Sequence, residues 1–239
     1  QAARTPGLRF VAVTDHNTTS HHADLAALQA ARPDLLLVRG QELATFRGHA
    51  NVFGTSVLLD FRLGHQGRTA TALVRDADAA GGLLSVNHPA RETGDTCTGC
   101  GWDAPDTPWG QVPVLEVVNG TRVEGPTAGL PYWYARLNEG HRRIGIGGSD
   151  DHGASQGQAQ IGTPTTVVYA DRLDEEAVLA GVRAGGVHIR TRGPEGPFLD
   201  VQATVGTQVA PMGGTLSLPA PARVTYELRT SRALGQTAH

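Results

Sequence analysis

Short apolar runs alternate along this chain with segments in which apolar residues recur at helical spacing. The apolar runs predict strands at 10–16, 35–43, 51–59 (a strand or a hairpin), 83–89, 114–120, 144–152 and 165–170. The segments between them predict helices at 20–31, 69–80, 129–140 and 174–185. Ser20 and Asp174 are the expected N-caps of the first and last helices, and glycine pairs at 81–82 and 185–186 are expected to end two of them. This alternation predicts an α/β fold with a parallel sheet, closed or open.

The pattern changes after about Gly193. The segments FLDVQATV and ARVTYELRT alternate apolar and polar residues with no helix between them, which is typical of an antiparallel sheet. We therefore expect two parts, a barrel over residues 1–193 and the beginning of a small β-rich, sandwich-like module over 194–239.

The composition is that of an ordinary globular protein, with 39% hydrophobic and 18% charged residues. A formal net charge of -3 gives no electrostatic reason to expect nucleic acid or an anionic membrane as a partner. All 20 basic residues are arginine, so Schiff-base catalysis and a phosphate-loop lysine are excluded. No apolar run has the length needed to cross a bilayer.

The two ends of the chain stop in mid-pattern. The first residues, QAARTPGLRF, lack the layout of a signal peptide and lead into a predicted strand almost at once. We expect the chain to be clipped at both ends, which leaves its localisation and oligomeric state open.

Residues that can bind a metal follow four of the predicted strands. They are Asp15 and His16, Glu42, His88, and the pair Asp150 and His152. The carboxyl ends of barrel strands share one face, which carries the active site in such folds. His49 is expected on the loop that leaves the Glu42 strand at the same end. Four strands ending in this way predict a metal site, because a lone histidine at a strand end is more often a simple loop residue.

The spacing of these residues suggests their roles. Asp150 and His152 lie two positions apart and would point the same way in an extended chain. Asp15 and His16 would point oppositely, so His16 is assigned to the metal and Asp15 to hydrogen bonding with a ligand. Imidazoles with bridging carboxylates suit zinc, manganese or iron. Two or three such ions would activate a bridging water for hydrolysis.

Other residues have weaker assignments. Arg91 is the best candidate to hold an anionic substrate oxygen, with a surface salt bridge as the equal alternative. Glu116 is expected to line the pocket or to polarise a ligand. Cys97 and Cys100 predict a local disulfide or two idle thiols, because one pair cannot build a tetrathiolate zinc site. The histidines at 21, 22, 65, 188 and 239 are expected to have no role in the metal site.

The ordered motifs TDH, a Glu followed closely by GH, NHP and GSDDH resemble the polymerase-and-histidinol-phosphatase (PHP) superfamily. Within it, RGQE, RGHANVFGT, NHPAR, EVVNG and GGSDDH look most like the CehA/McbA-type metallohydrolases. The resemblance implies a distorted, TIM-like (β/α)7 barrel with two or three divalent ions, and Glu42 bridging two of them. The positions that match its ligands are His16, Glu42, His49, His88, Asp150 and His152. The family's opening His-x-His strand would precede Gln1, so we expect a barrel without its first strand and incomplete metal binding.

These features favour a metal-dependent hydrolase that cleaves a small-molecule phosphoester or a carboxylic or carbamic ester. Its catalytic residues are expected to be Asp15, Arg91 and Glu116, beside the six metal ligands. One alternative is an amidohydrolase-like deaminase or lactonase, although a chain without lysine cannot supply the bridging carboxylated lysine common in such enzymes. The other is a degenerate barrel that binds metal without catalysis.

Overall fold

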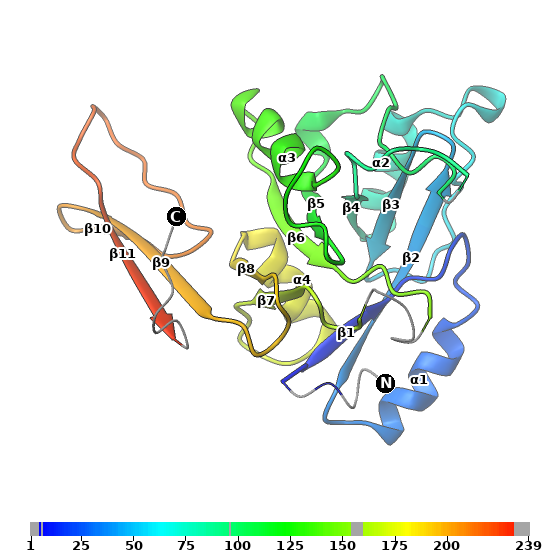
Figure 1. The fold of residues 1–239 in the computed structure, drawn as a ribbon, viewed down its shortest axis with the longest axis horizontal. Coiled ribbons are helices and arrows are strands. Elements are labelled where there is room, and N and C mark those ends of the chain that lie inside the picture. The colour runs from blue at the N-terminus through cyan, green and yellow to red at the C-terminus, as the bar shows by residue number, and fades with distance from the viewer. Residues whose placement is uncertain (1–4, 6, 96, 154–159, 232–239) are drawn as a thin grey trace.

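The computed structural model describes residues 5, 7–95, 97–153 and 160–231, and its largest element is a curled six-stranded sheet (Figure 1). The strands follow one another in chain order across this sheet. They are β1 (Phe10–Val13), β2 (Leu36–Thr45), β3 (Gly48–Phe53), β4 (Leu83–Asn87), β5 (Val114–Asn119) and β6 (Ile144–Gly148). The prediction of an α/β fold is therefore confirmed.

The sheet is mixed, whereas the alternation of strands and helices predicted a parallel one. The pairs β1–β2, β4–β5 and β5–β6 are parallel, whereas β3 runs antiparallel to both β2 and β4. The cause is a tight turn between Thr45 and Gly48, which leaves no room for a crossover helix. Gly48 has a φ of 131°, and a Cβ there would collide with the ring of Trp102. Only glycine fits this turn.

Four helices cover the strands, in the order α1 (His22–Ala31), α2 (Ala70–Ala79), α3 (Gly129–Asn138) and α4 (Glu175–Ala184). Helix α1 packs on β2, α2 on β4, α3 on β5, and α4 against β2 and β7. Short 3-10 turns lie at His65–Gly67 and Trp109–Gln111. Within the described chain, we find no helix long and apolar enough to cross a membrane.

Two of the predicted helix signals are confirmed and one is wrong. Asp174 caps α4 by accepting a hydrogen bond from the amide of Ala177, and Gly185 ends it in the left-handed conformation. Ser20 does not cap α1, whose N-cap is His21 without a side-chain bond. The Ser20 hydroxyl instead accepts a hydrogen bond from Thr18, which holds it in the preceding turn.

The two faces of the curled sheet bury different apolar clusters. Leu43, Val52 and Leu115 pack with α2 on the outer face. Val38 and Val114 pack with Leu179 of α4 on the inner face. Because successive strand residues point to opposite faces, every second residue from Val38 and Val114 also lies on the inner face. That alternation decides which polar residues face the inside.

Two smaller sheets follow the main one. Strands β7 (Thr165–Val168) and β8 (Val187–Arg190) form an antiparallel pair that packs beside β6. Strands β9 (Phe198–Val205), β10 (Gln208–Ala210) and β11 (Thr225–Ser231) form a separate antiparallel sheet to one side (Figure 1). The expected antiparallel character after Gly193 is thus confirmed. Strands β8 and β10 were not predicted from the sequence, because VHIR and QVA mix polar with apolar residues and do not form an apolar run like those of β1 and β7.

Candidate metal centre

The inner face of the sheet gathers polar side chains at one end. Glu42 lies on the inner face of β2, four residues after Val38. On β3, His49 pairs with Ala44, which lies two residues after Glu42 and therefore on the same face of the sheet. Asn87 of β4 pairs with His49, so His49 and Asn87 both lie on the face of Glu42. Glu116 joins them from β5, two residues after Val114. His49 was predicted on a loop and is a strand residue instead, because the chain turns back at Gly48.

The carboxylate of Glu42 is the hub of this group. Its Oε1 lies 3.2 Å from Nδ1 of His49 and 3.6 Å from Nε2 of His88. Its Oε2 lies 3.8 Å from Nδ1 of His16. The Asn87 side-chain amide also donates a hydrogen bond of 3.2 Å to Oε1. The two oxygens therefore face different histidines.

Glu42 is ionised although it is buried. Burial raises the pKa of its carboxyl group, but hydrogen bonds from His49 and His88 and the charge of His16 outweigh burial. The pKa of Glu42 therefore lies well below its usual range. A buried carboxylate ringed by imidazole nitrogens is a donor set that suits a divalent transition metal. The ligand atoms of His16, Glu42 and His49 lie within 4.8 Å of one another, close enough to share one ion.

His16 reaches the hub because the pairing of β1 with β2 continues past the end of β1. The amide of Glu42 donates to the carbonyl of Asp15 at 3.1 Å, and the amide of Asn17 donates to the carbonyl of Glu42 at 2.8 Å. The Nε2 atoms of His16 and His152 then lie 3.0 Å apart. This contact adds His152 to the group.

Glu116 supports the chain beside the ligands. Its Oε2 accepts hydrogen bonds from the backbone amide of His88 at 2.8 Å and from the side chain of Asn119 at 3.2 Å. Burial raises the pKa of Glu116 to about 7. In the described contacts, Glu116 holds the backbone of His88 and makes no bond to a ligand nitrogen. Glu116 also lines the cavity, as the sequence predicted, and its catalytic role stays a prediction.

Three non-glycine residues in this region have left-handed backbone. The φ angles are 54° at Asn17, 28° at His88 and 52° at Asp150. Such conformations are disfavoured for residues with a Cβ, and they concentrate at functional sites. The side chain of Asn17 is held in place by two hydrogen bonds: it donates one to the carbonyl of Ala44 and accepts one from the amide of Ala44.

The backbone turns at Asp150, where strand alternation predicted extended chain with Asp150 and His152 pointing the same way. Strand β6 ends at Gly148, so Asp150 and His152 do not lie in extended chain. Nδ1 of His152 instead lies 3.0 Å from the carbonyl oxygen of Asp150. The Asp150 carboxylate accepts a hydrogen bond of 3.0 Å from the guanidinium of Arg91. The alternative of a salt bridge for Arg91 is thus observed, but between two part-buried groups at the centre rather than on the surface.

Asp15 does not contact a predicted ligand through its side chain. Its carboxylate lies 3.4 Å from Nδ1 of His21 and is mostly exposed. Its hydrogen-bonding role is therefore played by its backbone carbonyl, which aligns Glu42. The hydrogen-bonding role predicted for the side chain of Asp15 stays a prediction, because the described contacts of that carboxylate are with His21 and not with a proposed ligand.

The histidines set aside from the sequence fall into different environments. His21 and His22 contact the carbonyls of Val13 and Gly40, and His65 is exposed. His188 is buried against Phe198. His239 lies outside the described residues.

The centre opens on one side into a cavity of about 1010 Å³ inside the curled sheet. The side chains of His16 and His152 are 40% and 62% exposed, whereas those of His49 and His88 are nearly buried. The centre is therefore open to solvent on the side of His16 and His152. Asn87 also lines the cavity, and the sequence reading did not assign it a role. Its position directly before His88 was the available signal.

The curled mixed sheet, its covering helices and the polar cluster at one end make up an α/β fold that can be compared with known proteins. No family model matches the chain, and no curated protein matches it. A similar solved structure is that of a two-domain protein containing a predicted PHP-like metal-dependent phosphoesterase from Bacteroides vulgatus ATCC 8482. The TM-score is 0.54 at 20% sequence identity. The match covers 78% of this chain and 57% of that one, so the chain spans little more than half of the neighbour's length.

Proposed function

We propose that the protein is a metal-dependent hydrolase that cleaves a small-molecule phosphoester or a carboxylic or carbamic ester. The observation that carries the proposal is the ionised, buried carboxylate of Glu42, which is surrounded by three imidazoles at the mouth of a large cavity. The PHP-like fold of the structural neighbour supports the same class of chemistry.

Six residues are proposed as ligands: His16, Glu42, His49, His88, Asp150 and His152. The two oxygens of Glu42 face different histidines, which supports a bridging role between two ions. The mixed imidazole and carboxylate donors suit zinc, manganese or iron, in two or three sites. When bound, such ions lower the pKa of a water molecule towards neutrality and polarise the oxygen of the ester.

The chain's own residues position this set and the substrate. Asn87 fixes the Glu42 carboxylate, and Glu116 fixes the backbone of His88. Arg91 presents a planar guanidinium beside Asp150, where it can exchange its carboxylate partner for an anionic substrate oxygen. The cavity wall also carries apolar side chains such as Val38, Phe53 and Val114, which can pack against the apolar part of an ester.

The finer assignments also belong to this proposal. The motifs from RGQE to GGSDDH support the CehA/McbA subtype and its seven-stranded barrel. The separate β9–β11 sheet supports a division near Gly193 into a barrel and a β-rich module.

The function is tested with a panel of phosphoesters, carboxylic esters and aryl carbamates. At least one compound should be hydrolysed, the rate should disappear after treatment with a chelator, and zinc or manganese should restore it. Hydrolysis that survives complete removal of metal would contradict the proposal. Metal binding without hydrolysis of any compound would favour the degenerate barrel, and release of ammonia from an amine substrate would favour the deaminase.

Arg91→Ala should weaken catalysis while the metal content stays unchanged. A hydrogen bond to a charged group contributes about 1.5–3 kcal/mol, so kcat/KM should fall roughly tenfold to a hundredfold. Steady-state kinetics on an anionic substrate measure the effect, with the exposed Arg75→Ala as the control. An unchanged kcat/KM would show that Arg91 serves only as the partner of Asp150.

A further inference from the structure

The turn Cys97–Cys100 lies directly against the candidate metal centre. The two cysteines form a disulfide, with Cys97 half-buried and Cys100 fully buried. The turn fits closely on the β2–β3 hairpin, because Gly99 has a φ of 69° and a Cβ there would collide with the carbonyl of Thr45. Neither the fold nor the proposed hydrolysis requires a cysteine pair at this place.

Two carbonyls of this turn contact the ring nitrogens of two proposed ligands. Nε2 of His49 lies 3.1 Å from the carbonyl oxygen of Thr98, and Nδ1 of His88 lies 3.2 Å from that of Cys100. A carbonyl oxygen beside one ring nitrogen fixes the orientation of the imidazole, so that the opposite nitrogen points away from the turn. Those opposite nitrogens, Nδ1 of His49 and Nε2 of His88, are the atoms that face Glu42. The turn and the Glu42 carboxylate thus contact opposite nitrogens of the same two rings.

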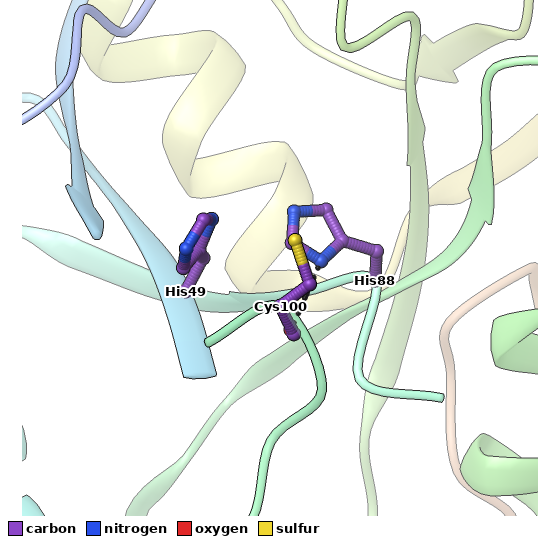
Figure 2. Close-up of side chains that lie close together, drawn as sticks. All are labelled: His49, His88 and Cys100. Atoms are coloured by element: carbon purple, nitrogen blue, oxygen red, sulfur yellow. Dashed lines mark hydrogen bonds between the residues drawn. The ribbon is translucent and has the colours of Figure 1, made fainter. Parts of the chain in front are cut away.

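The side chain of Cys100 points into the space that the two imidazoles share (Figure 2). Its Sγ and a nitrogen from each of His49 and His88 lie within 4.8 Å of one another. Zinc binds thiolate sulfur at about 2.3 Å and imidazole nitrogen at about 2.0–2.1 Å, so small side-chain rotations bring the three atoms to one ion. In the disulfide, however, the sulfur is bonded to Cys97 and is not a thiolate.

We propose that reduction of the Cys97–Cys100 disulfide creates a second, thiophilic metal site formed by His49, His88 and Cys100. The reductant is a dithiol, which attacks the accessible sulfur of Cys97 and expels Cys100 as a thiolate. The second thiol of the reductant then releases Cys97, so the dithiol is oxidised to a disulfide as the protein disulfide is reduced by two electrons. The Cys100 thiolate then binds a soft divalent cation such as zinc together with the two imidazoles.

This site would compete with the hydrolytic centre, because it draws His49 and His88 away from Glu42. This inference rests on the proposed function only because the two sites share His49 and His88. The consequence is redox control, since oxidation favours the Glu42 centre and reduction favours the thiolate site.

The test is titration of the metal-free protein with Co²⁺, followed by absorption spectroscopy. Cobalt bound to a thiolate gives an intense sulfur-to-metal charge-transfer band in the near ultraviolet, whereas nitrogen and oxygen ligands give only weak visible bands. We expect the band in wild-type protein reduced with a dithiol, and in Cys97→Ser without any reductant. We expect no band in oxidised wild-type protein or in Cys100→Ser, which is the matched control because it retains the other cysteine.

Absence of the band in reduced wild-type protein, with both thiols detected by a thiol assay, would overturn the proposal. So would an equally strong band in Cys100→Ser. If Cys97→Ser does not fold, reduced wild-type protein and Cys100→Ser still decide the question. The weak visible bands of oxidised wild-type protein report the Glu42 centre separately, so failure of the thiolate site is distinguishable from failure of the hydrolytic one.

Discussion

Replacing Glu42 with glutamine should remove most of the bound metal and all measurable hydrolysis while the fold is retained. Glutamine has nearly the same shape but no negative charge, and its amide nitrogen cannot bind a cation. Glu42 is the group that contacts His16, His49 and His88 together, so its loss breaks the centre at its hub. Loss of a residue that only supports a ligand typically lowers metal affinity about 10- to 100-fold, and loss of the bridging carboxylate should exceed that.

Elemental analysis of the purified variant measures its metal content, and circular dichroism measures its fold. The matched control is Glu176→Gln, an exposed residue in the first turn of α4 that should keep wild-type metal content. A Glu42→Gln protein that retains its metal and its turnover would remove Glu42 from the centre.

His88→Asn should have an effect of similar size. His88 is buried, with Nε2 directed at Glu42 and backbone at a φ of 28°. Asparagine tolerates the left-handed region better than most residues, so its loss of metal would report the missing imidazole rather than backbone strain. We expect hydrolysis to fall below detection and metal content to fall by at least one ion for each chain. His88→Ala should do the same and should also unfold at a lower temperature.

The control for this variant is His65→Ala, because His65 is exposed and lies outside the polar cluster. Metal content and thermal unfolding are compared for His88→Asn, His88→Ala and His65→Ala under the same conditions. Wild-type turnover by His88→Asn would show that this imidazole is not a ligand.

The fold could be predicted from the sequence as far as its strands were long enough to show a pattern. The runs that became β1, β2 and β4 to β7 were recognised. The strand or hairpin expected at 51–59 overlaps β3 only at its end, and the antiparallel direction of β3 was not predicted. That direction depends on Gly48, whose close contact with Trp102 joins two segments far apart in the chain. Hydrophobic spacing does not encode such a contact. Strand β8 was not predicted because its sequence, VHIR, is not an apolar run like those of the other short strands.

The site could be predicted where side chains that can bind a metal lie at the ends of apolar strands. His16, Glu42 and His88 could be placed together because each follows an apolar strand. The geometry of Asp150 and His152 could not, since β6 ends at Gly148 and a left-handed residue follows. The role of Asn87 as a donor to Glu42 and the packing of the Cys97–Cys100 turn on the histidines arise only in the folded chain.

The central claim is that Glu42 and its neighbouring imidazoles hold divalent ions. The most direct measurement is an anomalous difference map from crystals of the oxidised protein grown with zinc or manganese, collected at the absorption edge of the metal. We expect a peak within bonding distance, about 2.0–2.2 Å, of the Glu42 carboxylate, with Nδ1 of His49 or Nε2 of His88 on the same ion. Fully occupied peaks elsewhere in the molecule, with none beside Glu42, would contradict the claim.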